Sequence, residues 1–214
     1  MLTTRYLIYI SILLIISLYG MITYRKHDQR FKYLILLVVF VFVSEVMTRV
    51  AAYTWRSSMP VYHFMVPVQL VLFWLVYSTK LKNTLLAILF GSAFLFSLFY
   101  SGFAQSILTF PSIQICFLSF VVILASLVDL KGLLKTSTQL KLSENPNVWF
   151  NFGNITFYSL TFFIFGLMNI SIDIFPDWIY TFIFFANLIL YVCYGIAIHY
   201  SRKNTTFDTF NNTD

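Results

Sequence analysis

The amino-acid sequence predicts an all-α polytopic membrane protein, built as a bundle of seven transmembrane helices. Of its 214 residues, 59% are apolar, 20% are aromatic and only 10% are charged, whereas about 25% of the residues in an ordinary soluble domain are charged. Seven separate runs are apolar enough and, at about 20 residues, long enough to cross about 30 Å of hydrocarbon as helices. These runs are residues 6–24, 33–52, 61–78, 85–100, 107–128, 149–170 and 178–199.

The ends of these runs carry residues typical of a membrane surface. The first run is followed by the basic residues Arg25 and Lys26 and by no small-residue cleavage site, which predicts a retained helix and no cleaved signal peptide. Aromatic rings prefer the headgroup level, and they bracket several runs at Tyr24, Tyr100, Trp149 and Trp178. The third, fifth and seventh runs have prolines at or near one end, where proline can start or kink a helix.

Basic residues gather in alternate loops, which predicts the orientation. Most Lys and Arg residues lie in the first, third and fifth loops and in the carboxyl-terminal tail, while the other side has Arg5, Arg49 and Arg56. By the positive-inside rule we expect the N-terminus outside and the C-terminus in the cytoplasm, in a multi-pass protein of the cell inner (cytoplasmic) membrane. The formal charge of +6 then reflects topology and contact with anionic lipid, and no nucleic-acid partner is expected.

The chain is predicted to hold one domain. Residues 1–200 form a single seven-helix transmembrane domain, and residues 201–214 form a short cytoplasmic polar tail. The only extended soluble stretch is 131–146, and neither it nor the tail reaches the roughly 50 residues that a separate domain needs. Besides the lipid bilayer, we therefore expect another membrane or cytoplasmic protein as a partner that carries any output.

Polar residues divide the runs into two sets. The first and fourth are mainly Leu, Ile, Phe and Ser, which favours wide contact with lipid, whereas the others carry polar stripes. In the sixth run, Asn151, Asn154 and Tyr158 follow the spacing i, i+3, i+7, so they share one helical face. We interpret this secondary polar stripe, near the inner membrane face, as a contact between helices.

Glu45 and Arg49 mark the best candidate site, because they lie one helical turn apart inside the second run. A lone ionised side chain in hydrocarbon costs roughly 3 to more than 10 kcal/mol, so such residues normally face a protein interior and partner each other. Other polar residues fall at a similar depth, roughly 10 to 14 Å from the outer surface or just above it. The complete candidate layer is Glu45, Arg49, Tyr62, His63, Gln69, Gln114, Thr161 and Asn187.

This layer has two interpretations. Buried polar side chains can simply hold membrane helices together, at about 0.6 kcal/mol for each hydrogen bond. Alternatively, acid, base, amide and imidazole groups at one depth form an outward-facing polar pocket that binds a small-molecule ligand or ions. In the second interpretation His63 lies near Glu45 and Arg49 and is the pH-sensitive member, since imidazole titrates near neutrality.

The residue types present argue against several kinds of site. A retinal protein needs a lysine within a span, and every lysine lies in a loop or the tail. The three histidines are divided between the two predicted membrane sides, so we expect no metal centre and no haem. No cofactor is predicted.

Two resemblances follow from these motifs. Glu45 and Arg49 are similar to part of the paired-glutamate and arginine motif of the CAAX-protease-like membrane hydrolases, but Ser44 stands where the other glutamate belongs and the expected downstream histidines within spans are missing. Taken with the stretches 60–63, 67–69 and 149–153 and with Asn187, the same pair resembles uncharacterised seven-span inner-membrane proteins of Bacteroidota, in which Glu is more frequent at the position of Gln69. That resemblance implies a sensor-like architecture with no established activity.

We therefore expect a receptor-like or signalling-associated membrane protein that passes the state of its pocket to a partner chain, and no enzyme. Two alternatives stay open. The first is a small-solute transporter of three-plus-one-plus-three helix design, which also has seven spans. The second is a structural or assembly subunit of a membrane complex, in which the Glu45 and Arg49 pair specifies packing.

Overall fold

The computed structural model describes residues 2–81, 83–104, 106–136, 142–168 and 177–211, and over these residues it contains helices and no strand. Seven helices are each long enough and apolar enough to cross a membrane, which confirms the predicted number of spans. They are α1 (Leu2–Thr23), α2 (Gln29–Thr54), α3 (Met59–Ser78), α4 (Thr84–Phe99), α5 (Ser112–Thr136), α6 (Pro146–Met168) and α7 (Asp177–Asn211).

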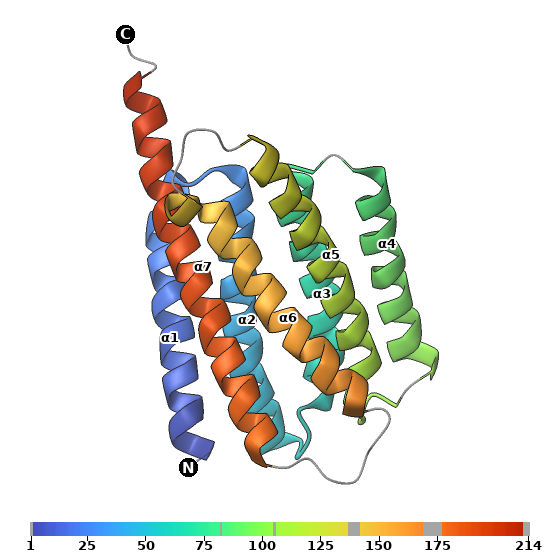
Figure 1. The fold of residues 1–214 in the computed structure, drawn as a ribbon. Helices are drawn as coiled ribbons and strands as arrows, with labels where there is room; N and C mark the ends of the chain where they lie inside the picture. Colours follow the sequence, from blue (N-terminus) through green and yellow to red (C-terminus); the bar gives the residue numbers. More distant parts are fainter. Residues whose placement is uncertain (1, 82, 105, 137–141, 169–176, 212–214) are drawn as a thin grey trace.

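The helices form a sequential ring that closes where α7 packs against α1. Each helix packs on its neighbour in the chain, and α3 with α5 and α2 with α7 make further contacts across the ring. The two ends of the chain lie at opposite ends of the bundle (Figure 1). We call these ends the amino-terminal end, where α1 begins, and the carboxyl-terminal end, where α7 finishes.

Helices α1 and α4 are the least buried, at 22% of their spans against 33–44% for the other five. Helix α4 packs mainly against α3 and α5 at the edge of the bundle (Figure 1). This arrangement agrees with the predicted wide lipid contact of the first and fourth runs. Most of the interior is consequently built by α2, α3, α5, α6 and α7, and α1 and α4 each add one buried side to it.

Local sequence explains several helix ends. The Asp28 carboxylate accepts a hydrogen bond from the Phe31 N–H at 3.0 Å and caps α2, and the Asn83 side chain caps α4. Such caps satisfy N–H groups that lack an intrahelical partner. In the connection before α3, Arg56 has a positive φ of 55°. Pro60 then occupies the first turn of α3, where its missing N–H costs nothing.

The fifth and seventh helices extend beyond their predicted ends. Helix α5 begins at Ser112, directly after Pro111, and continues to Thr136, whereas the sequence predicted a span over 107–128. This extension places Asp129 inside the helix. Helix α7 runs on to Asn211, so most of the predicted polar tail continues the helix.

Candidate functional site

A cavity of about 120 Å³ lies inside the bundle, lined by every helix except α4. Five residues of the predicted layer line it: Glu45, Tyr62, Gln69, Thr161 and Asn187. They come from α2, α3, α6 and α7. Four of them lie in the half of their helix nearer the amino-terminal end, and Gln69 lies at the middle of α3. The sequence predicted Tyr62 just above the level of the other four, and the fold brings all five around one space.

Aromatic rings form much of the cavity wall. The lining includes Tyr9, Tyr62, Phe73, Phe157, Tyr158, Tyr191 and Tyr194. Among them, Tyr158 belongs to the predicted secondary polar stripe. Tyr9 was missed by the sequence interpretation, because the first run was assigned as a whole to lipid contact. Its hydroxyl donates a hydrogen bond to Glu45 Oε1 at 3.2 Å, so α1 also contributes to the site.

Glu45 and Arg49 do not form the ion pair that their spacing predicts, although the structure describes both. Glu45 is partly buried and faces the cavity, whereas the Arg49 guanidinium lies 3.9 Å from the centre of the Tyr6 ring. The tyrosine face attracts the cation in place of the carboxylate. The two side chains therefore point to different neighbours even though they begin one turn apart.

A second hollow of about 240 Å³ lies next to the cavity, between α1, α2 and α7. Arg5, Arg49 and Tyr6 contribute to its lining, and Tyr9 and Asn187 line both spaces. Because these two residues are shared, the hollows are adjacent. Arg49 thus lines the second hollow, and Glu45 lines the cavity.

Several polar groups in the cavity keep unused hydrogen-bonding capacity. The Thr161 hydroxyl and the Asn187 amide each donate to a carbonyl of their own helix, at 2.8 Å. Gln69 is only partly buried and lines the cavity, and its side-chain amide makes no hydrogen bond with the described residues. Buried polar groups normally have partners, so these groups favour a cavity occupied by water or by a polar ligand.

His63 and Gln114 lie in a different cluster, away from the cavity lining. The His63 Nε2 donates to the Thr109 carbonyl at 2.9 Å, which makes Nδ1 the acceptor in the neutral ring, facing Ser101 Oγ at 3.0 Å. Gln114 donates to the same Ser101 oxygen at 2.9 Å. Tyr62, the neighbour of His63 on α3, lines the cavity, whereas His63 does not. The cluster instead joins α3 to the adjacent ends of α4 and α5.

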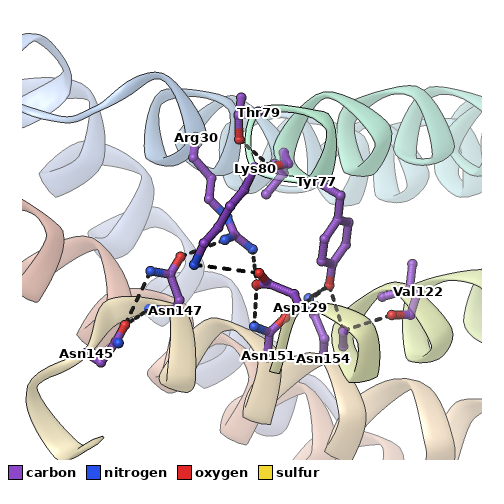
Figure 2. Close-up of polar contacts among 12 residues, drawn as sticks. Arg30, Tyr77, Thr79, Lys80, Val122, Asp129, Asn145, Asn147, Asn151 and Asn154 are labelled. Atoms are coloured by element: carbon purple, nitrogen blue, oxygen red, sulfur yellow. Dashed lines mark hydrogen bonds and ion pairs between the residues drawn. The ribbon is translucent and has the colours of Figure 1, made fainter. Parts of the chain in front are cut away.

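A buried charge cluster lies near the carboxyl-terminal end of the bundle (Figure 2). Arg30 Nη2 on α2 and Asp129 Oδ2 on α5 are 2.5 Å apart, and their side chains are 5% and 1% exposed. Arg30 Nη1 also donates to Asn147 Oδ1 at 2.7 Å. The Lys80 ammonium, 41% exposed, lies 3.7 Å from Asp129 Oδ1. Two cations from neighbouring helix ends thus share one carboxylate.

A series of hydrogen bonds joins this charge cluster to the cavity, and Figure 2 shows its members Asn154, Tyr77, Asn151 and Asp129. The Tyr194 hydroxyl, in the cavity wall, donates to Asn154 Oδ1 at 2.5 Å. Asn154 Nδ2 donates to the Tyr77 hydroxyl at 2.9 Å, and that hydroxyl lies 3.5 Å from Asn151 Oδ1. Asn151 Nδ2 donates to Asp129 Oδ2 at 2.6 Å. We call Tyr194, Asn154, Tyr77, Asn151 and Asp129 the polar relay.

The Tyr77 hydroxyl can donate its single proton in two directions. Ser126 Oγ lies 2.6 Å away, and Ser126 itself donates to the Val122 carbonyl, which leaves it as an acceptor for Tyr77. Asn151 Oδ1 is the other acceptor, at the longer distance of 3.5 Å. One proton cannot serve both acceptors. Tyr77 is therefore the position at which the polar relay has two possible arrangements.

Two atoms of the charge cluster lack hydrogen-bond partners among the described residues. Arg30 Nε and Asp129 Oδ1 are buried and unbonded, although Lys80 lies near the latter. Burial lowers the pKa of the Lys80 amine from its ordinary value, and the nearby Asp129 carboxylate opposes that shift. Lys80 therefore links a buried carboxylate to the surface of the molecule.

The sequence interpretation missed this charge cluster for an identifiable reason. Arg30 was counted as a loop charge, and Asp129 followed the predicted end of its run by one residue. The helical spacing of Leu130, Leu133 and Leu134 after Asp129 was the available signal that the helix continues. The secondary polar stripe was recognised, and the structure places Asn151 and Asn154 at 0% exposure.

No protein-family model, no curated protein and no solved structure matches the chain. The arrangement itself offers two chemical features. One is a small aromatic cavity with a single carboxylate. The other is the polar relay that leads from this cavity to a partly exposed lysine.

Proposed function

We propose that this chain is a receptor-like, signalling-associated membrane protein in which the occupancy of the cavity is passed to a partner chain. The observation that carries the proposal is the polar relay, because it connects the cavity wall to the carboxyl-terminal end through buried groups. A bundle held together only by scattered polar contacts has no need for such a continuous series.

Tyr77 provides the switching element in this proposal. A ligand that displaces the Tyr194 hydroxyl alters the position of Asn154, which holds the Tyr77 hydroxyl from the other side. Tyr77 then changes its acceptor between Ser126 and Asn151. A ligand can shift such an equilibrium only through a difference in its contacts with the two states, and contact with Tyr194 supplies one.

The output reaches the surface at Lys80. A change at Asn151 alters how Asp129 is held, and Asp129 in turn attracts the Lys80 ammonium. In the predicted orientation this end of the bundle faces the cytoplasm, where a partner would contact it.

Packing between the two ends supports a receptor over a transporter. Between the cavity and the charge cluster, the side chains of Tyr77, Phe150 and Tyr194 pack ring against ring, at centroid distances of 5.5 and 5.7 Å, and Phe73 packs on Tyr77. All four are almost completely buried. A solute would have to displace this closely packed layer, whereas a rearrangement of hydrogen bonds would not.

A fluorescent reporter beside Lys80 tests the proposal. An environment-sensitive dye is attached to Thr79→Cys, an exposed position, in full-length protein whose Cys116 and Cys193 are replaced by alanine. We expect Tyr194→Phe to shift the dye emission, because it removes the hydroxyl that holds Asn154. In an Asn154→Leu background the same change should have no further effect.

Tyr191→Phe is the matched control, since Tyr191 lines the same cavity but its hydroxyl is not among the hydrogen-bond partners that the structure shows for the Asn154 side chain, which are Tyr194 and Tyr77. It should leave the emission unchanged. The proposal fails if Tyr194→Phe also leaves the emission unchanged, or if the two variants shift it equally.

A further inference from the structure

We propose that the cavity binds a small organic cation, an amine or a quaternary ammonium ion, between the Glu45 carboxylate and the surrounding aromatic rings. This inference rests on the proposed function only in that the cavity is the ligand site. It adds the chemical class of the ligand, for which charge, wall composition and size each supply an argument.

Charge is the first argument. Glu45 is the only ionisable acid or base other than tyrosine among the residues that line the cavity. Its carboxylate accepts one side-chain hydrogen bond, from Tyr9. The expected counter-ion Arg49 lies over the Tyr6 ring, so its charge reaches Glu45 only through space and makes no ion pair with it. A carboxylate in a low-dielectric interior is strongly stabilised by a nearby opposite charge. A bound cation would place such a charge in direct contact with the carboxylate.

The wall is the second argument. Seven aromatic side chains line a space whose other groups are mostly aliphatic. The face of an aromatic ring attracts cations, and cages of such rings are the usual receptors for quaternary ammonium groups. A cation–π contact of this kind is present next to the cavity, where the Arg49 guanidinium lies 3.9 Å from the centre of the Tyr6 ring.

Size is the third argument. The cavity measures about 120 Å³, far below the roughly 300–1,000 Å³ of pockets for drug-sized ligands. It is nevertheless larger than the space of a single water, whose share of liquid volume is about 30 Å³. A compact cation such as choline or tetramethylammonium matches this range. The free Gln69 amide provides a partner for a hydroxyl or an amine N–H of such a ligand.

Binding of three probes to the purified full-length protein tests the inference. The probes are tetramethylammonium, choline and 3,3-dimethylbutan-1-ol, which has the shape of choline without its charge, and calorimetry measures their affinity. We expect choline to bind at least about tenfold more tightly than the neutral alcohol. Glu45→Gln should abolish this preference. Tyr62→Leu should weaken the binding of both choline and tetramethylammonium.

Glu144→Gln is the matched control, because it removes a carboxylate at the opposite end of the bundle. It should leave choline affinity unchanged. The inference is overturned if neither cation binds wild-type protein, if choline and the neutral alcohol bind equally, or if Glu45→Gln keeps the preference. The comparison of probes on wild-type protein needs no variant, so it decides the matter even where a variant fails to fold.

The two proposals fail separately. If Tyr194→Phe shifts the reporter at position 79 and no cation binds, the ligand class is wrong and the receptor proposal stands. If choline binds with the expected preference and the reporter does not respond, the cation site stands and the signalling proposal is wrong.

Discussion

Asp129 shows how unequal the two oxygens of one buried carboxylate can be. Oδ2 accepts hydrogen bonds from Arg30 and Asn151, at 2.5 and 2.6 Å. Oδ1 accepts none among the described residues and has only the Lys80 ammonium at 3.7 Å. Arg30 is further held by two ring faces, with its guanidinium carbon 5.2 Å from the Phe150 centroid and 5.7 Å from that of Tyr77.

Removal of one member of this pair should therefore be more harmful than removal of both. Asp129→Leu leaves a buried guanidinium without its carboxylate, and breaking a buried pair in this way costs about 3–5 kcal/mol. Arg30→Met leaves the carboxylate with the Asn151 amide and with the more distant Lys80 as its cation. The double variant replaces the pair by apolar groups and should recover much of the loss. Thermal unfolding of the detergent-solubilised protein measures all three.

The decisive quantity in that experiment is the coupling energy, which is the difference between the stability loss of the double variant and the sum of the two single losses. If the losses of the single variants simply add in the double variant, the two charges are not energetically paired. Tyr24→Phe, at a partly buried position outside the cluster, is a suitable control and should leave the unfolding temperature nearly unchanged.

At the scale of the element, α6 combines two functions along one face. Asn151 and Asn154 belong to the polar relay, and Tyr158 and Thr161 line the cavity. This face can lie deep in the bundle because Gly153 lets α7 approach closely. A Cβ atom at position 153 would lie 2.8 Å from the Cβ of Cys193.

Gly153→Ala should destabilise the protein for this reason. The clash involves a Cβ atom that cannot rotate away, so α6 and α7 must separate, and overpacking of this kind costs about 1–3 kcal/mol. Gly91→Ala in α4 is the matched control, since a Cβ there has nothing within 4 Å. That control should be neutral or slightly stabilising, because alanine favours helix by up to about 1 kcal/mol. Equal unfolding temperatures for both variants would contradict the predicted close contact.

At the scale of the whole molecule, the cavity and the charge cluster lie toward opposite ends of one bundle. Helices of alternating direction place Glu45 near the amino-terminal end and Arg30, at the start of the same helix, near the other (Figure 1). The proposed receptor therefore needs a particular orientation, with the cavity toward the outside. The distribution of basic residues predicts that orientation.

Labelling of single cysteines with a membrane-impermeant thiol reagent tests the orientation. In a background without Cys116 and Cys193, Ser106→Cys lies in the α4–α5 connection and Ser143→Cys in the α5–α6 connection, both at exposed positions. We expect position 106 to react in intact cells and position 143 to react only after permeabilisation. The reverse pattern would place the cavity on the cytoplasmic side.

Much of the fold could be predicted from the sequence, because hydrophobic length is a local property. The seven spans were recognised, and the lipid contact of the first and fourth followed from their lack of polar residues. The ends of α5 and α7 were missed, since polar residues such as Asp129 and Arg202 also occur inside helices when they have partners. Three statements stay predictions. They are the orientation of the chain in the membrane, the identity of that membrane, and the resemblance to seven-span proteins of Bacteroidota.

The sequence by itself determined which residues share a depth. Span boundaries and the rise of 1.5 Å per residue were enough to bring Glu45, Gln69 and Asn187 to one level. Only the tertiary structure decided which of them meet, because that depends on the rotation of each helix about its axis and on the reach of long side chains. Arg49 reached a ring on α1, and His63 turned toward α5. The relay from Tyr194 to Asp129 joins four helices, and no local pattern encodes such an arrangement.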